Sequence, residues 1–311
     1  MEQIVQFQSG GKEIFGILHS PDLPMRQLRV GIIIAKHRIG PHRIYVQAAR
    51  RWSKEGFHVL RMDFPGEGDS MGDYRYYHID YYMDEFQIPA LLDAIRYLKE
   101  REEVEKVVLF GLCTSARAVL YTAGVCPEVQ HIILLSMPFS STSIDSPETA
   151  SFKKSEIVSS VRAKAILIKY LKILMQPHKW KKLLRGDDQF SFRFLVMLIN
   201  SLLKRNRERL FHGRIYISMR TLFERQGHIL FVYGNVDWVT KDFTEAFQLL
   251  RPTIQGIDLL SEIFIVESAN HVFSRIEWKA NVIEYITAWL NRQFSIERDK
   301  KDLLNYTIKK R

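Results

Sequence analysis

The residue best suited to covalent chemistry is Cys113, in the stretch KVVLFGLCTSARAVLYTAG at positions 106–124, where a strand pattern runs directly into a helical one. A nucleophile on such a sharp turn needs small residues two positions before and after it, and Gly111 and Ser115 meet that need. The turn places the thiol at a helix N-terminus, which favours a thiolate, and directs the Thr114 N–H toward a developing oxyanion. Because cysteine is also a common core residue, this stretch by itself predicts a nucleophile and a buried thiol equally well.

An acid and a histidine follow two later strand patterns. Asp237 comes just after the apolar run at 228–234, and His271 lies in the loop after the run at 262–268. A single Asp or His is usually a helix cap or a surface residue. Here three loops carry a nucleophile, an acid and a histidine in a chain order that known triads use, so we predict a Cys113–His271–Asp237 triad.

Short apolar strand patterns alternate with helical patterns along most of the chain, which predicts an α/β fold with a mostly parallel central sheet and helices on both faces. The predicted strands lie at 2–7, 12–20, 28–35, 57–64, 106–110, 130–138, 228–234 and 262–268, and the predicted helices at 45–56, 83–102, 115–123, 242–250 and 276–294. Ser9–Gly11 is the expected turn of an opening hairpin, Pro89 predicts a kink or a late start of its helix, and Gly124 predicts a helix end. Ligands of such sheets bind beyond the carboxyl ends of the strands, where the three triad residues are expected.

These features together resemble the α/β-hydrolase superfamily over nearly the whole chain. DFPGEGDS at 63–70 is similar to the Asp-x-x-Gly-x-Gly-x-Ser turn after the fourth strand in the serine-aminopeptidase-like and lipase-like branches, and GNVDWV and SANHVF resemble the acid and histidine loops there. Within the superfamily, GLC at the turn, RIGPHR at 38–43 and WKKLLRG at 180–186 resemble the exosortase A system-associated hydrolases of the first type. The resemblance implies an α/β-hydrolase fold with a cap inserted over the nucleophile.

The sequence departs from the superfamily pattern at two positions. The usual nucleophile is serine, and here it is Cys113. The usual His-Gly after the third strand is replaced by AKHRIG at 35–40. By its position in the superfamily, the second oxyanion donor would be a backbone N–H near His37, beside that of Thr114.

A cysteine at this turn favours acyl transfer, because a thiol paired with a histidine ionises readily and its thioester passes the acyl group on easily. We therefore expect a thioesterase, esterase or acyltransferase that acts on an apolar acyl substrate, carrier- or CoA-bound. Two alternatives stay open: a C–N or C–C bond hydrolase of the amidase or dienelactone type, and a non-catalytic binding protein with this fold. Cysteine turns in the superfamily belong to dienelactone hydrolases and to polyhydroxyalkanoate synthases, so they leave hydrolysis versus transfer open.

The net charge of +10 is concentrated in an insertion between two strands. Residues 151–225 carry 18 Lys and Arg against 5 Asp and Glu, which leaves the remainder of the chain at about −3. We predict an α/β-hydrolase core at 1–144 and 226–295, a helical basic cap at 145–225 and a charged C-terminal tail at 296–311. The basic face suits an acidic acyl carrier protein, a CoA or phosphopantetheine phosphate, or an anionic membrane surface; a merely solvated face is the alternative.

Other functional classes are not favoured. Cys113 and Cys126 are too far apart along one helical segment to pair, which indicates a reducing, cytoplasmic setting, in solution or at a membrane surface. GEGDS lacks the lysine of a phosphate loop, and the two histidines of KHRIGPHR are five apart on a loop, so we expect no cofactor and no metal. Because no base-stacking module is recognisable, no nucleic-acid partner is expected.

Overall fold

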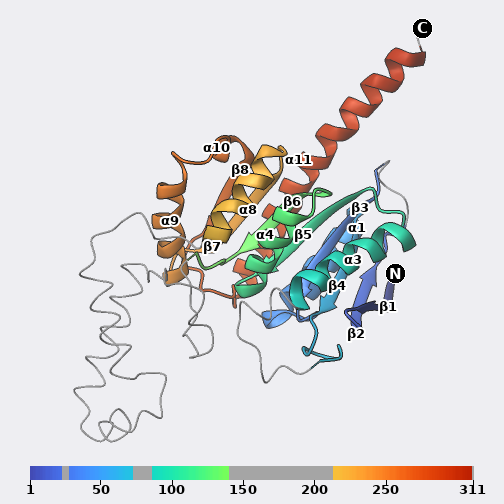
Figure 1. Cartoon of the computed structure of the whole chain (residues 1–311), viewed down its shortest axis with the longest axis horizontal. Coiled ribbons are helices and arrows are strands. Elements are labelled where there is room, and N and C mark those ends of the chain that lie inside the picture. Colours follow the sequence, from blue (N-terminus) through green and yellow to red (C-terminus); the bar gives the residue numbers. More distant parts are fainter. Residues whose placement is uncertain (23–27, 73–85, 140–212, 310–311) are drawn as a thin grey trace, which may run out of the picture.

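The computed structural model describes residues 1–22, 28–72, 86–139 and 213–309, with side chains described as far as Phe294 (Figure 1). Most of the predicted cap at 145–225 therefore lies outside the described residues. The partners expected from its basic face, an acyl carrier protein, CoA or a membrane surface, stay predictions.

One sheet of eight strands forms the centre of the molecule, in the order β1-β2-β4-β3-β5-β6-β7-β8. Its strands are β1 (Glu2–Ser9), β2 (Lys12–His19), β3 (Val30–Lys36), β4 (His58–Asp63), β5 (Lys106–Leu112), β6 (Val129–Leu135), β7 (His228–Gly234) and β8 (Ser261–Val266). β2 is antiparallel to both of its neighbours, and every other neighbouring pair is parallel. The predicted mostly parallel sheet is thus confirmed, and the carboxyl ends of β3 and of β5 to β8 meet at one edge.

The inner strands are apolar on both faces because helices cover both. Nearly every residue of β3, β5, β6 and β7 is buried, as expected where neither face of a parallel sheet meets water. The opening hairpin is different, since most residues of β1 are exposed. Its turn consists of Gly10 and Gly11 at φ +54 and +74, the left-handed backbone that a two-residue hairpin loop requires.

The helices are divided between the two faces of the sheet (Figure 1). Helices α1 (Ile44–Lys54) and α11 (Ile276–Lys309) pack with one apolar cluster, which contains Trp52, Phe110 and Trp289. The opposite cluster takes side chains from α3 (Ile88–Arg101), α4 (Thr114–Val125), α8 (Gly213–Glu224) and α9 (Trp238–Leu250). Two short helices, η1 (Pro41–Arg43) and α10 (Ile257–Leu260), complete the described elements.

Helix α8 lies inside the segment predicted to be the cap, yet it packs as part of the body. Ile215, Met219 and Leu222 are fully buried, and the helix lies against α4. Gly124 allows this approach, because a Cβ there would lie 2.7 Å from the Oγ of Ser218. The prediction that Gly124 ends its helix is therefore wrong, since α4 continues to Val125. Helix α8 thus packs with the core, and the predicted bounds of the cap stay a prediction.

The two ends of the helical layer also refine the sequence predictions. The α-helix α3 begins at Ile88 with Pro89 in its first turn, where a missing N–H costs nothing. Phe86 and Gln87 before it are π-helical, and the start of the predicted helix at 83–85 lies outside the described residues. α11 runs to Lys309, so the predicted tail, as far as residue 309, continues the last helix, which extends away from the sheet in Figure 1. Among the described residues, no helix combines the length and apolar character needed to cross a membrane.

Candidate active site

Cys113 occupies the sharp turn between β5 and α4. Its backbone has φ 60 and ψ −121, a conformation that residues with side chains rarely adopt and that is typical of strained functional turns. Gly111 makes the turn possible, because a Cβ there would lie 2.6 Å from the backbone N of Ala116. The thiol is partly exposed at the edge of the sheet, whereas Cys126 is buried at the other end of α4.

Ser115 contributes more than its small size. Its Oγ accepts a hydrogen bond from the Leu112 N–H at 3.0 Å and donates to the Leu112 carbonyl at 2.9 Å. The N–H of Cys113 donates to the Leu135 carbonyl of β6 at 2.8 Å. These bonds fix the backbone on both sides of Cys113 and so maintain its strained conformation.

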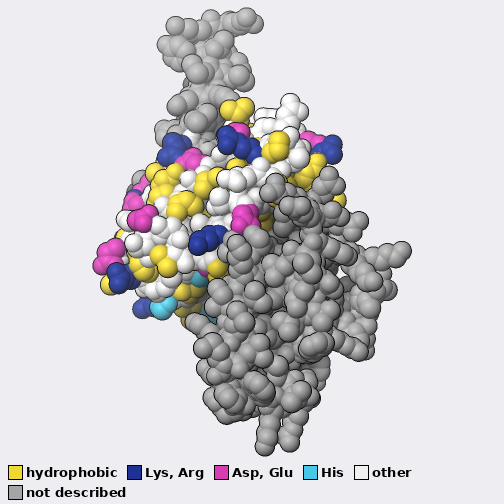
Figure 2. Space-filling model, turned by 90° about the vertical axis from the view of Figure 1, so that its left-hand side faces the viewer, with side chains coloured by type: hydrophobic (Ala, Val, Ile, Leu, Met, Phe, Trp, Pro, Cys, Tyr) yellow, Lys and Arg dark blue, Asp and Glu magenta, His cyan; other side chains and the backbone are white. Residues whose placement is uncertain are grey.

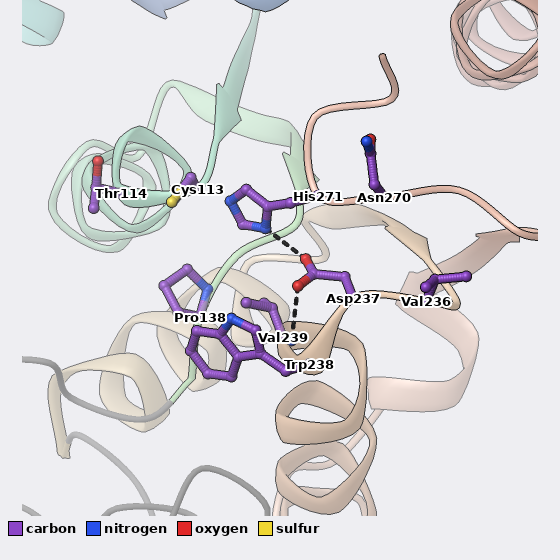
Figure 3. Close-up of a pocket in the computed structure, with 9 residues that line it drawn as sticks. All are labelled: Cys113, Thr114, Pro138, Val236, Asp237, Trp238, Val239, Asn270 and His271. Atoms are coloured by element: carbon purple, nitrogen blue, oxygen red, sulfur yellow. Dashed lines mark hydrogen bonds and ion pairs between the residues drawn. The ribbon is translucent and has the colours of Figure 1, made fainter. Parts of the chain in front are cut away.

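Asp237 and His271 lie on the following loops of the same edge. The Nδ1 of His271 is 2.5 Å from the Oδ2 of Asp237, and the imidazole ring lies between that carboxylate and the sulfur of Cys113 (Figure 3). Asp237 is buried as the N-cap of α9, where its Oδ1 accepts from the Val239 N–H at 3.2 Å. The structure therefore brings the three residues of the predicted triad together from three separate loops.

The acid loop and the histidine loop are joined to each other. The N–H of Val236 donates to the Ala269 carbonyl at 3.2 Å. Gly234 permits this contact, because a Cβ there would lie 2.3 Å from the same oxygen. Ser136, fully buried after β6, donates from its Oγ to the His271 carbonyl at 3.0 Å. The backbone that carries the imidazole is thus supported from two sides.

The electrostatics of the site favour a thiolate–imidazolium pair. Burial raises the pKa of Cys113, but hydrogen bonding and charge at His271, with smaller contributions from Lys36 and the Thr114 N–H, outweigh it, and the pKa is lowered. Burial lowers the pKa of His271, while the hydrogen bonds and charges of Asp237 and Cys113 raise it to about 10. Both shifts favour a proton on His271 and an ionised sulfur on Cys113.

The end of β3 and the start of α4 meet beside Cys113. The Thr114 N–H is directed to the cysteine sulfur, and its predicted part in binding an oxyanion stays a prediction. His37 follows β3, its Nδ1 accepts from the Ile39 N–H at 3.3 Å, and within the described residues no hydrogen bond uses its own backbone N–H. The side chain that reaches Thr114 is that of Lys36, whose Nζ lies 3.3 Å from the threonine Oγ1.

A buried acid supports the loop after β3. Asp63 is fully buried at the end of β4 and accepts from the Arg38 N–H at 2.6 Å and from the Arg38 guanidinium. Gly68 is required here, because a Cβ at that position would collide with the Asp63 carboxylate. Ser70 Oγ donates to the Asp63 carbonyl at 2.9 Å. The DFPGEGDS motif therefore anchors Arg38 and with it the loop after β3.

A cavity of about 540 Å³ opens at the three central residues (Figure 3). It is lined by Cys113, Thr114, Pro138, Val236, Asp237, Trp238, Val239, Asn270 and His271. Apolar side chains from Pro138, Trp238 and Val239 form a wall next to the reactive groups (Figure 3). A cavity with a few polar groups at one end of an apolar wall suits a small organic or acyl group.

Sequence reasoning missed three residues of this site: Lys36, Ser136 and Trp238. Each directly follows or ends a strand at the carboxyl edge, or begins the helix after it, and that position was the signal available in the sequence.

Nothing in the described part of the chain offers a metal three or more His, Cys, Asp or Glu ligands in one group.

No family model and no curated protein sequence matches this chain. Solved structures do match it. Est1E from Butyrivibrio proteoclasticus, in a structure with bound ferulic acid, aligns with a TM-score of 0.58 at 13% identity over 94% of this chain and 99% of that one. The α/β hydrolase GrgF from Penicillium sp. sh18 aligns at 0.56 and 18% identity, over 95% of this chain and 99% of that one. An esterase from Pyrococcus furiosus aligns at 0.54 and 16% identity, over 93% and 91%.

These alignments define the class of fold. The chain has the α/β-hydrolase fold, which confirms the fold predicted from the sequence. At these identities the likeness concerns the fold alone. The narrower resemblance to the exosortase A system-associated hydrolases, and the use of cysteine as nucleophile, stay predictions.

Proposed function

We propose that this chain is an acyl-transfer enzyme, a thioesterase, esterase or acyltransferase, that works through an acyl thioester on Cys113. One observation carries the proposal. An imidazole lies between a buried carboxylate, 2.5 Å from its Nδ1, and a cysteine held at φ 60 on a strand-to-helix turn. Such backbone strain costs on the order of 1–3 kcal/mol and persists where surrounding structure enforces it, commonly at reactive residues.

Two further features support acyl chemistry. The apolar wall beside Cys113 suits the acyl part of a substrate. Among the solved structures of similar fold, one is named as an esterase and another as a putative lipase. Both kinds of enzyme transfer an acyl group to water, which is the simplest form of the proposed reaction.

Acylation begins when the Cys113 thiolate attacks the carbonyl carbon of the substrate. The new S–C bond forms as the carbonyl π pair moves to oxygen, and the resulting oxyanion lies toward the Thr114 N–H. When this pair returns, the bond to the leaving group breaks. His271 then transfers its proton to the departing thiolate, alkoxide or amine, and a thioester on Cys113 remains.

Deacylation needs the opposite protonation state, and the site itself supplies it. Two causes that raise the pKa of His271, the hydrogen bond and the charge of Cys113, disappear once the sulfur is acylated. The pKa of the imidazole therefore falls, which favours the neutral ring that accepts a proton from the incoming water, alcohol, amine or thiol. That acceptor bonds to the acyl carbon, the thiolate leaves with the S–C pair, and the resting ion pair forms again.

The test is to detect the acyl-enzyme directly. The wild-type protein is mixed with a panel of acyl-CoA and small acyl thioesters, and the reaction is quenched in acid within the first turnovers. The mass of the intact protein is then measured by mass spectrometry. We expect a gain equal to one acyl group, located on Cys113, and no gain for Cys113→Ala. Cys126→Ala is the matched control, because it removes the chain's other cysteine, and it should be acylated like wild type.

The same experiment separates this proposal from the alternatives. A non-catalytic binding protein would show no acyl adduct with any donor, and acylation that persists in Cys113→Ala would contradict the nucleophile. An amidase or dienelactone-type enzyme would form its adduct only when amides or lactones replace the thioesters.

A further inference from the structure

Lys36 ends β3 in an unusual backbone conformation. Its φ is 125, in the region that favours glycine, and its carbonyl accepts from the Phe64 N–H at 2.8 Å. β3 lies next to β5 in the sheet, so the side chain crosses from one strand end to the next. There its Nζ donates to the Oγ1 of Thr114 at 3.3 Å, in a partly buried position. A strained residue thus presents an ammonium group to the nucleophile turn.

The ammonium lies among active-site groups and not in a surface ion pair. Over the described residues, no ion pair includes Lys36, and its one side-chain hydrogen bond is that to Thr114. Its charge helps to lower the pKa of Cys113. Burial raises the pKa of the Glu67 carboxyl, and the charges of Lys36 and His37 partly offset this rise. Glu67 is therefore a further neighbour of the ammonium. A lysine has three N–H donors, so two remain for a bound group.

We propose that the Lys36 ammonium is a catalytic group that binds the oxyanion formed on the substrate carbonyl, beside the Thr114 N–H. This inference rests on the function proposed above for Cys113. Lys36 keeps all its protons through the cycle, because the carbonyl oxygen gains the π pair on attack and returns it when the leaving group departs. The lysine contributes positive charge where negative charge develops, at the position where the superfamily pattern has His-Gly.

Two effects of Lys36 on Cys113 can be separated by the choice of reagent. Iodoacetamide alkylates the sulfur by displacement: an S–C bond forms, the C–I bond breaks, and iodide leaves with its electron pair. No oxyanion arises, so this rate reports the amount, reactivity and accessibility of the thiolate but not the oxyanion. Acylation by a thioester depends on the thiolate and on the oxyanion. At a pH above the Cys113 pKa the thiolate is fully formed, and differences in acylation then report the oxyanion alone.

The experiment measures single-turnover acylation by a small acyl thioester and alkylation by iodoacetamide, each across pH to its plateau. The variants are Lys36→Met, which keeps the length and removes the charge, and Lys36→Arg, which keeps the charge. Lys106→Met is the matched control, because Lys106 begins β5 at the opposite end of the sheet. We expect Lys36→Met to lower the acylation plateau roughly 10²-fold and to leave the alkylation plateau nearly unchanged. Lys36→Arg should recover part of the loss, and Lys106→Met should match wild type.

The outcomes divide clearly. An acylation plateau that Lys36→Met leaves unchanged, in a protein whose wild type is acylated, would overturn the role of Lys36 and leave the function of Cys113 standing. An equal loss of both plateaus would show that Lys36 merely supports the turn, and would overturn the inference as well. If wild type itself formed no acyl-enzyme while alkylating normally, the proposed function would fail and this inference with it.

Discussion

Two histidines at opposite ends of the same sheet have pKa values that are shifted in opposite directions. His131 lies near the start of β6 and stacks on His228 of β7, with ring centroids 5.3 Å apart. Trp289 and Phe294 pack against it. Burial, with the charges of His228 and Lys106, lowers the pKa of His131 to about 3. At the carboxyl end of the strands, the pKa of His271 is raised to about 10.

Burial does not separate the two, since it lowers both pKa values. The difference lies in the neighbours. His131 faces cationic groups and aromatic rings, so its neutral form is favoured and the ring serves as a core side chain. His271 faces the Asp237 carboxylate and the Cys113 sulfur, which stabilise the imidazolium. One end of the sheet is thus built for packing and the other for charge.

Among the variants that test this comparison, His271→Ala should have the largest effect on activity. Acylation of Cys113 should fall by roughly 10⁴-fold, because the variant loses the group that holds the ion pair and moves the proton. The pH at which Cys113 alkylates should rise, since the hydrogen bond and charge that lower its pKa are gone. Iodoacetamide labelling across pH measures this shift. His131→Gln is the control and should match wild type, and an unshifted profile in His271→Ala would exclude the pairing.

A smaller effect is expected from Asp237→Asn, with a loss about 10²-fold smaller than that of His271→Ala, because Asp237 orients the ring and does not react. Asparagine is also a good N-cap and can still accept from the Val239 N–H, so stability should hardly change. The pKa of His271 should fall, because Asp237 is one of the groups that raise it. The basic limb of the acylation pH profile should therefore move to lower pH. If the basic limb of the acylation profile did not move while the variant stayed as stable as wild type, the role of Asp237 in orienting and charging His271 would be contradicted.

The smallest effect is expected at the other end of the sheet and concerns stability. The pKa of His131 is lower in the folded protein than the unfolded value near 6.5, so the unfolded state binds the proton first. The stability that the neutral His131 ring contributes is fully present above pH 6.5 and is lost as pH falls toward 3. Over that range the free energy of unfolding changes by at most ~1.4 kcal/mol per pH unit. His131→Gln should flatten this slope in urea unfolding at pH 7.5 and 5. His19, whose pKa is lowered to about 4 by burial, acts in the same direction and is present in both proteins. Parallel slopes would contradict the prediction.

Part of the site was predictable because its signals are local. The turn at Cys113 needs small residues at fixed offsets, and Gly111 and Ser115 occupy them. The strand ends before Asp237 and His271 follow from apolar runs of six or seven residues. Gly124 shows the limit of such reasoning. Its flanking sequence predicts a helix end, but contact with Ser218 of α8 decides its place.

What the sequence by itself determined is therefore the alternation of strands and helices and the turn that carries Cys113, both set by residues within a few positions of one another, together with the chain order of Cys113, Asp237 and His271. The tertiary structure alone decided that Lys36 reaches Thr114, 78 residues away. It also decided that α8 packs with the body, and that the pKa of His131 is lowered while that of His271 is raised. These outcomes depend on which strand ends lie side by side, and strand order arises from packing of the whole sheet, which no local pattern encodes.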